Sequence, residues 1–249
     1  MNNELLFAGE DDNPEVFETV DGEGPLVGKP SIFIRLFGCN LRCGMFASAD
    51  SPYGCDSYIS WSKKHRVSFE ELDKIFEERN YVEKLRCGTY LKVSGGEPTL
   101  RQQPILDYIA HFSEKYGFIP RIDVETNCTI TPVADWQEKY NATFTVSPKL
   151  STNGDAIEKT YKPETIQWHV DHMSSFKFVV TRSEDIDEIW TKFVTPFNIP
   201  KHRIWLMPCC GSRAEHIERA PAVVEYAKAL GVNFSPRLHL LLWDKCLRV

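Results

Sequence analysis

Short apolar runs alternate with segments of helical periodicity along most of the chain. Residues 31–37 form a β-branched apolar run between Pro30 and Gly38, which predicts a buried strand. Similar runs predict strands at residues 90–93, 121–124, 143–146, 176–180 and 203–207. Helical spacing of apolar residues predicts helices over residues 68–76, 100–116, 184–193 and 214–230. About six strands separated by helices are typical of an α/β fold with a mainly parallel sheet.

Two of the predicted helices carry signals at their ends. Ser68 and Glu71 have the spacing of a capping box, which predicts that a helix starts after Ser68. The last helix is expected to restart at Pro221 and to stop at Gly231. An extended segment over residues 233–243 is expected to follow it.

The length and composition favour one domain with a large core. The chain has 249 residues, of which 42% are hydrophobic, so it can bury enough surface without disulfides. We expect a flexible, polar segment over residues 1–15 and a single domain over residues 16–249. Because no secretory signal or membrane-length apolar run is present, we expect a cytoplasmic protein without membrane contact.

The charge and the cysteine content reduce the number of possible functions. A formal net charge of −6 argues against a broad nucleic-acid-binding surface. Disulfides are rare in a reducing compartment. The eight cysteines are therefore interpreted as metal ligands, reactive thiols or small buried apolar groups.

Polar segments directly follow four of the predicted strands. They are residues 38–57, 94–98, 125–127 and 147–149. The carboxyl ends of parallel strands meet at one edge of a sheet, and ligands bind there in α/β proteins. Gly95 and Gly96 alone favour a tight turn, although the lack of Cβ atoms also lets a ligand approach the backbone. The shared position of the four segments favours a binding site.

Three cysteines lie in the irregular loop of residues 38–57. Cys39, Cys43 and Cys55 have the spacing C-x3-C-x11-C. Three thiolates can hold three irons of a [4Fe–4S] cluster and leave the fourth iron open to a ligand. A structural zinc site is the alternative, and it requires a fourth ligand such as Cys87 or Cys128. The spacing alone does not decide between the two.

The combination and order of these segments resemble the radical S-adenosylmethionine (SAM) superfamily and, within it, the 7-carboxy-7-deazaguanine synthases. Residues 17–41 look like the amino-terminal signature of that family. Residues 94–98 (SGGEP) resemble its SAM-binding motif, and residues 125–127 (ETN) resemble its ribose-binding segment. Residues 146–149 (VSPK) are similar to another characteristic segment. The resemblance implies SAM contacts by Gly95, Gly96, Glu97, Glu125, Asn127, Ser147 and Lys149.

The cysteine loop departs from the usual superfamily spacing, C-x3-C-x2-C. Phe46 stands where that spacing would put the third cysteine, whereas Cys55 precedes Asp56-Ser57, similar to the residues that follow the third ligand in the family. We interpret the difference as an insertion of nine residues between the second and third ligands. Asp21 also stands where the family usually has Gln, which predicts altered substrate contacts.

The resemblance implies an incomplete TIM-type barrel with about six mainly parallel strands and a cluster loop at residues 38–57. It also implies a [4Fe–4S] cluster on Cys39, Cys43 and Cys55, SAM as a reusable cofactor, and Mg²⁺ on the hydroxyl of Ser57. The implied reaction contracts 6-carboxy-5,6,7,8-tetrahydropterin to 7-carboxy-7-deazaguanine with loss of ammonia, in 7-deazapurine and queuosine biosynthesis. A reducing donor such as flavodoxin and a homodimer are implied as partners.

The same resemblance assigns the substrate contacts. They are expected at Asp21, Glu23, Arg35, Ser94 and His239, and Glu23 and Arg35 join the three cysteines as candidate catalytic residues. A carboxylate at Glu23 matches the paired N–H donors of a pterin. The planar fork of Arg35 fits a substrate carboxylate, and the alternative for Arg35 is a structural charge with a buried partner.

Two other functions remain open from the sequence. A glycyl-radical-type activating enzyme would share the cluster and SAM but act on a protein. A non-catalytic zinc-binding or Fe–S-binding protein would not cleave SAM. Cysteines outside the loop are interpreted as small apolar groups: Cys87, Cys128, Cys209, Cys210 and Cys246.

Overall fold

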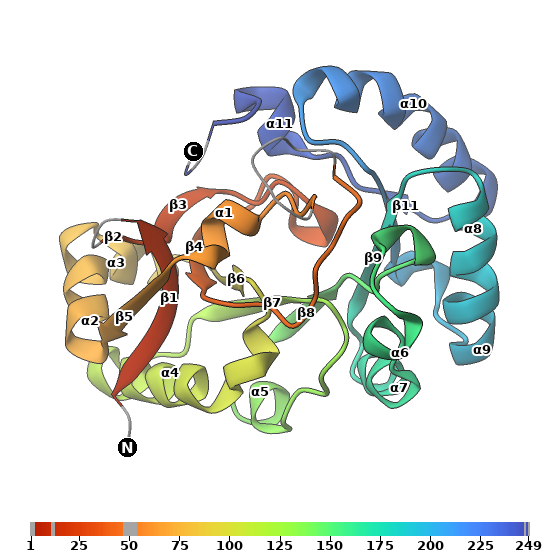
Figure 1. Cartoon of the computed structure of the whole chain (residues 1–249). Coiled ribbons are helices and arrows are strands. Elements are labelled where there is room, and N and C mark those ends of the chain that lie inside the picture. The colour runs from red at the N-terminus through yellow and green to blue at the C-terminus, as the bar shows by residue number, and fades with distance from the viewer. Residues whose placement is uncertain (1–2, 11–12, 47–53, 247, 249) are drawn as a thin grey trace.

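The central sheet is mainly parallel, so the predicted α/β class is confirmed (Figure 1). The computed structural model describes residues 3–10, 13–46, 54–246 and 248. Neighbouring parallel strands follow the order β4, β6, β7, β8, β9, β10, β11. They are β4 (Pro30–Leu36), β6 (Tyr90–Gly95), β7 (Arg121–Thr126), β8 (Thr143–Val146), β9 (Ser175–Val180), β10 (Ile204–Pro208) and β11 (Asn233–Phe234).

Alternate residues along these strands face opposite sides of the sheet. On β6 and β7, Val93 and Val124 lie in the hydrophobic core. The intervening positions carry Lys92 and Asp123, which are paired in register and also joined by an ion pair. One side of the sheet is therefore apolar and the other gathers charged side chains.

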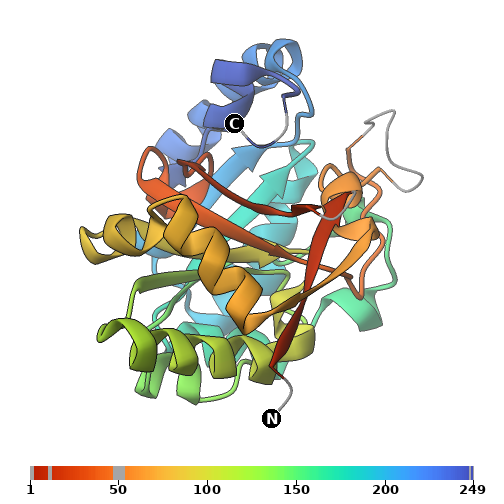
Figure 2. The ribbon, with the colours of Figure 1, turned by 90° about the vertical axis from the view of Figure 1, so that its left-hand side faces the viewer.

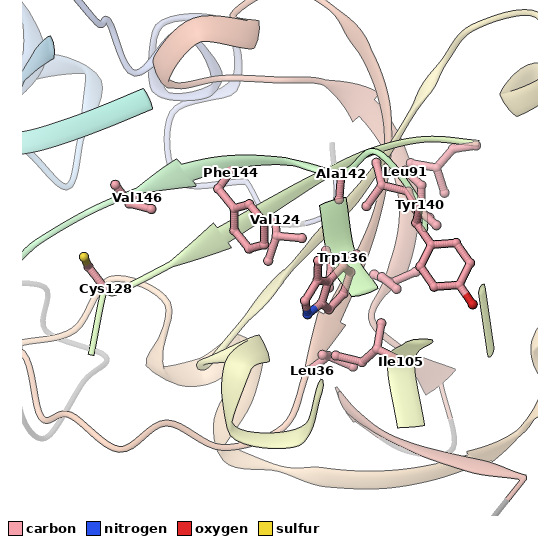
Figure 3. Close-up of a cluster of buried hydrophobic side chains, with 14 of the residues drawn as sticks. Leu36, Leu91, Ile105, Val124, Cys128, Trp136, Tyr140, Ala142, Phe144 and Val146 are labelled. Atoms are coloured by element: carbon pink, nitrogen blue, oxygen red, sulfur yellow. The ribbon is translucent and has the colours of Figure 1, made fainter. Parts of the chain in front are cut away.

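Helices cover the apolar side of the sheet. Ile105 on α4 (Gln102–Tyr116) and Trp136 on α5 (Asp135–Glu138) are buried there. Figure 3 shows both side chains among Leu36, Val124 and Phe144 of the parallel strands. The Trp136 indole also donates a hydrogen bond to the side chain of Gln102, 3.0 Å away, so its polar atom is satisfied inside the core.

The amino-terminal part of the chain extends the sheet with antiparallel strands. The expectation of a flexible segment over residues 1–15 is wrong for its described part, because β1 (Glu4–Glu10) pairs with both β4 and β5 (Lys64–Ser68). Leu5 and Phe7 of β1 are at most 2% exposed, so this strand belongs to the core. Figure 2 shows β1 beside β5 at this edge.

The remaining strands and helices complete these layers. The strands are β2 (Asn13–Pro14) and β3 (Val16–Val20), and the helices are α1 (Tyr58–Ser62), α2 (Phe69–Glu78), α3 (Tyr81–Arg86), α6 (Ile157–Thr160), α7 (Pro163–Asp171), α8 (Glu184–Glu188), η4 (Ile189–Val194), α9 (Thr195–Phe197), α10 (Arg213–Leu230) and α11 (Leu238–Trp243). Short 3-10 turns lie at η1 (Gly24–Leu26), η2 (Pro98–Arg101), η3 (Ser151–Asn153) and η5 (Lys201–Arg203). The capping box of α2 is confirmed, since Ser68 and Glu71 exchange hydrogen bonds between side chain and backbone.

The carboxy-terminal part differs from the prediction in two places. α10 runs without a break through Pro221, which lies on its exposed face, where water can bind the carbonyl that lacks an N–H partner. The helix does stop at Gly231, whose φ of +66° ends it in the left-handed region. The segment over residues 233–243 is not extended throughout, because α11 forms after the short strand β11 and buries Leu240.

Candidate functional site

A cavity of about 370 Å³ opens where the predicted polar segments meet. It contains residues from the loop after β4 and from the ends of β6, β7 and β8, together with the turn before η1 and the start of α11. Among the sequence-predicted site residues, those that line it are Asp21, Glu23, Arg35, Cys39, Cys43, Cys55, Ser57, Ser94, Gly95, Gly96, Glu125, Asn127, Ser147, Lys149 and His239. The four segments therefore do share one edge of the sheet.

A buried lysine lies beneath the cavity. Lys92 of β6 is 0% exposed, and its ammonium group lies 2.7 Å from carboxylate oxygens of both Asp21 and Asp123. A third carboxylate, that of Glu125, is 3.4 Å away. Burial opposes the charge of Lys92, but the carboxylates outweigh it and raise the lysine pKa well above its usual value. Burial raises the pKa of Asp21, despite the nearby lysine.

Lys177 of β9 lies between two carboxylates: that of Glu23, a candidate substrate contact, and that of Glu125, a candidate SAM contact. Its ammonium group lies 2.6 Å from Glu23 Oε2 and 3.5 Å from Glu125 Oε1. Burial alone would raise the pKa of Glu125, but Lys177 and Lys92 outweigh it and hold that pKa at about 2. Ser94 also donates a hydrogen bond to Glu125, at 3.1 Å. Glu125 is therefore an ionised acceptor at neutral pH.

Arg237, just before α11, binds the other oxygen of Glu23. Its Nε lies 2.7 Å from Glu23 Oε1, and its Nη2 lies 2.5 Å from Asp56 of the cysteine loop. Lys177 and Arg237 together overcome the burial of Glu23 and hold the Glu23 pKa well below its usual value. Burial and the charge of Arg237 lower the pKa of His239 to about 4, so this histidine is neutral at pH 7.

The three loop cysteines line the cavity as free thiols. Residues 47–53 of the predicted cluster loop, and with them most of the predicted insertion, lie outside the described residues. Burial raises the pKa of all three thiols, that of Cys55 to about 11. Asn127 and the backbone of Leu41 donate to the Cys39 sulfur, at 3.8 and 3.5 Å. Among the described residues, no three His, Cys, Asp or Glu side chains are arranged around a common metal position.

The two glycines after β6 allow a close backbone approach. A Cβ on Gly96 would lie 1.9 Å from the carbonyl oxygen of Gly38, next to Cys39. Gly95 has a φ of +120°, and a Cβ there would lie 2.2 Å from the backbone nitrogen of Leu36. Both glycines therefore fit the end of β6 against the start of the cysteine loop, and both also line the cavity.

Glu97 is placed differently from the other predicted cofactor residues. It is 2% exposed and does not line the cavity. One of its oxygens accepts hydrogen bonds from the hydroxyls of Thr99 and Thr126, at 2.6 and 2.7 Å, and the other from the Asn127 backbone, at 2.7 Å. Burial raises the pKa of Glu97. In this structure Glu97 holds the segment that carries Asn127 and does not itself face the cavity.

Arg35 lies in the cavity wall, next to two aromatic rings and one carboxylate. Its guanidinium carbon lies 5.0 Å from the ring centre of Phe17 and 6.0 Å from that of Phe33. Glu15 lies 3.9 Å from its Nη1. The side chain is 26% exposed, so Arg35 has a carboxylate partner and also presents a surface to the cavity.

Five charged residues that lie in or beneath the cavity were given no site role from the sequence: Lys92, Asp123, Lys177, Arg237 and Asp56. Lys92 and Lys177 each interrupt an apolar strand run, and that interruption is the signal that could have identified them. Their partners come from other strands and loops, so the pairing itself has no local sequence signal.

The comparisons with known proteins agree with this geometry. A scan against protein-family models finds no match. The 7-carboxy-7-deazaguanine synthase of Halobacterium salinarum is 31% identical over 255 residues, covering 92% of this chain and 89% of the relative. That of Pyrobaculum aerophilum is 29% identical over 231 residues, covering 92% and 93%. The crystal structure of QueE from Escherichia coli shares the fold, with a TM-score of 0.66 over 94% of both chains at 22% identity.

Proposed function

The chain belongs to the 7-carboxy-7-deazaguanine synthase family, and we propose that it contracts 6-carboxy-5,6,7,8-tetrahydropterin to 7-carboxy-7-deazaguanine with loss of ammonia. The observation that carries this proposal is the cavity that unites the loop cysteines with Glu23 and Arg35 at one edge of the sheet. This reaction belongs to 7-deazapurine biosynthesis, and its radical SAM chemistry requires an Fe–S cluster and SAM.

The cysteine loop would hold the cluster. Cys39, Cys43 and Cys55 supply three soft sulfur donors to one cavity, and such donors suit an iron–sulfur cluster. When bound, the cluster would supply the electron that cleaves SAM to start the radical reaction. Metal binding displaces thiol protons, so the raised pKa values of these cysteines oppose loading most at low pH. The three side chains fit the cluster by their chemistry.

Other cavity residues would hold SAM and substrate. The ionised Glu125 and the half-buried Ser147 and Lys149 supply an acceptor, a hydroxyl and an ammonium group for the polar parts of SAM. Each oxygen of Glu23 has a second lone pair beyond its contact with Lys177 or Arg237, so Glu23 can still accept paired N–H donors of a pterin.

Arg35 would bind the substrate carboxylate, and Ser57 would bind Mg²⁺ through its hydroxyl. Asp21, Ser94 and the neutral His239 would complete the substrate contacts. Glu97 would act indirectly, by holding the Asn127 segment.

The proposal extends to the architecture and partners of the protein. The open run of parallel strands supports an incomplete TIM-type barrel, within a single domain that includes the amino-terminal strand β1. A homodimer and a reducing donor such as flavodoxin are proposed from the family alone. Among the described residues, no helix is both long and apolar enough to cross a membrane.

The decisive experiment is anaerobic reconstitution with iron and sulfide, followed by incubation with SAM, reductant, Mg²⁺ and 6-carboxytetrahydropterin. Mass analysis is expected to show 7-carboxy-7-deazaguanine with release of ammonia. SAM cleavage without that product would favour the activating-enzyme alternative, and no cleavage of SAM would favour a metal-binding scaffold.

Iron and acid-labile sulfide in cysteine variants test the ligand assignment. Cys55→Ala is expected to lose the intact cluster, whereas Cys87→Ala, an exposed cysteine outside the cavity, is expected to keep it. Full cluster retention without Cys55, or loss without Cys87, would exclude the proposed ligand set.

A further inference from the structure

Arg237 connects three segments that are far apart in the sequence. Its guanidinium group binds Glu23 near the start of η1, Asp56 of the cysteine loop and the backbone carbonyl of Cys210 after β10. Its own backbone N–H donates to His216 of α10, at 3.0 Å. The residue is 6% exposed, so these contacts are made away from bulk water.

We propose that Arg237 is a positioning residue that fixes the turn carrying Cys55 and Ser57 against the candidate substrate carboxylate, Glu23. Asp56, which Arg237 binds, lies between these two residues in the sequence. The roles of Cys55, Ser57 and Glu23 rest on the proposed function, but the fixing of the turn by Arg237 does not.

The chemistry of the side chain suits this bridge. A guanidinium group directs its N–H donors along fixed directions in one plane, and here Nε and Nη2 each reach a different carboxylate. Lysine has a single, more flexible ammonium group and cannot reproduce this fork. The guanidinium carbon also lies 5.1 Å from the ring centre of Phe46, within the same loop, which adds a second contact to that segment.

Both ends of the bridge are anchored. Lys177 holds the other oxygen of Glu23, at 2.6 Å, so Glu23 is a firm point of attachment. At the loop end, the Tyr58 N–H donates to the Cys55 carbonyl, at 3.2 Å, and closes the turn around Asp56. The side chains of Glu23 and Asp56 are 17% and 22% exposed, so loss of Arg237 would leave two largely covered carboxylates without this cation, and the turn would open more often.

Hydrogen exchange of the Tyr58 amide in the metal-free protein tests the proposal without any turnover. Arg237→Met is expected to speed this exchange at least about tenfold, the factor for losing one hydrogen bond between charged groups. Arg237→Lys is expected to restore only part of the protection. Arg219→Met is the matched control, because Arg219 binds the neighbouring carbonyl of Cys209, at 2.5 Å, and within the described part of the chain it forms no ion pair with a cavity carboxylate.

A double-mutant cycle separates the bridge from a general loss of structure. Asp56→Asn removes the loop end, and the double variant with Arg237→Met is expected to exchange no faster at Tyr58 than the faster single variant. Unchanged Tyr58 exchange in Arg237→Met, or additive effects in the cycle, would overturn the proposal. Arg237→Met is used only if it folds, which protection of the β6 amides shows. If it does not fold, Asp56→Asn alone tests the proposal, and it is expected to speed exchange of the Tyr58 amide about tenfold.

The enzymatic consequence has its own readout. Arg237→Met is expected to raise KM for the carboxypterin about tenfold, with the Arg219→Met KM unchanged. Absence of carboxypterin turnover in the wild type would contradict the proposed function and leave the exchange result standing. Unchanged exchange with normal turnover would contradict only the role of Arg237.

Discussion

Lys92 is the cation at the centre of the buried ion pairs beneath the cavity, which also include Asp21, Asp123 and Glu125. Replacing it with methionine should remove this charge while keeping a side chain of similar length. Lys92 is 0% exposed and lies 2.7 Å from both Asp21 and Asp123. Removing one partner of a buried ion pair destabilises a protein by about 3–5 kcal/mol, because the remaining charge has no compensation. Protonation limits this loss, since neutralising a carboxylate of ordinary pKa at pH 7 costs about 4 kcal/mol. The two limits agree, and we expect Lys92→Met to lower the free energy of unfolding by about 3–5 kcal/mol at pH 7.

The loss should depend on pH with a definite sign. Glu125, whose native pKa is held at about 2 partly by Lys92, stabilises the fold above its ordinary pKa of 4.5 and loses that contribution as the pH falls toward 2. Lys92→Met removes part of this contribution. The difference between wild type and variant should therefore be largest near pH 7 and shrink below about pH 4.5.

Urea denaturation at pH 7 and pH 3, followed by tryptophan fluorescence, measures this difference. Lys74→Met is the control, because Lys74 is 72% exposed and forms a surface pair with Glu78 at 3.7 Å. That variant should change the free energy of unfolding by less than about 0.5 kcal/mol. A Lys92→Met loss below about 1 kcal/mol, or a loss that is equal at both pH values, would refute the reasoning.

The remaining predictions concern the cavity wall and one helix start. Gly96→Ala should lower the free energy of unfolding by about 1–3 kcal/mol, because the new Cβ would meet the Gly38 carbonyl at 1.9 Å. Urea denaturation measures this loss, and Gly211→Ala is the control, because the nearest atom to its new Cβ is 3.7 Å away. Lys177→Met should raise KM for the carboxypterin about tenfold at unchanged iron content, because it frees one oxygen of the candidate substrate carboxylate; an unchanged KM would contradict this. Ser68→Ala should lower the free energy of unfolding by about 1 kcal/mol, because it removes the capping box of α2; an equal midpoint in urea would contradict this.

The parallel core was accessible from the sequence because its strands are buried on both sides. Most of these strands appear as short apolar runs, as for Pro30–Leu36 and Ser175–Val180, and polar segments follow several of their carboxyl ends. Once the strands are parallel, these polar segments must share an edge, which explains why the predicted site residues converge. The strand Glu4–Glu10 was missed because its apolar centre, residues 5–8, is short and lies between polar and acidic residues.

The buried ion pairs beneath the cavity were harder to predict from the sequence, for a different reason. A charged residue within an apolar strand, such as Lys92 or Lys177, indicates a position that needs a partner. It does not say which carboxylate supplies it, since the partner of Lys177 is 154 residues away. Arg237 has no periodic signal of this kind, because it lies in an irregular segment between β11 and α11.

The pairing of these charges links folding to binding. Glu23 is held from both sides by Lys177 and Arg237, so its charge and orientation are set before any ligand arrives. A carboxylate that is already ionised and oriented loses little freedom on binding, and the cost of its desolvation was met during folding. Because the same ion pairs hold the fold together, a substitution of Lys177 or Arg237 changes both stability and binding. Measuring unfolding beside KM is therefore necessary to assign a loss of activity to the contact between Glu23 and the substrate.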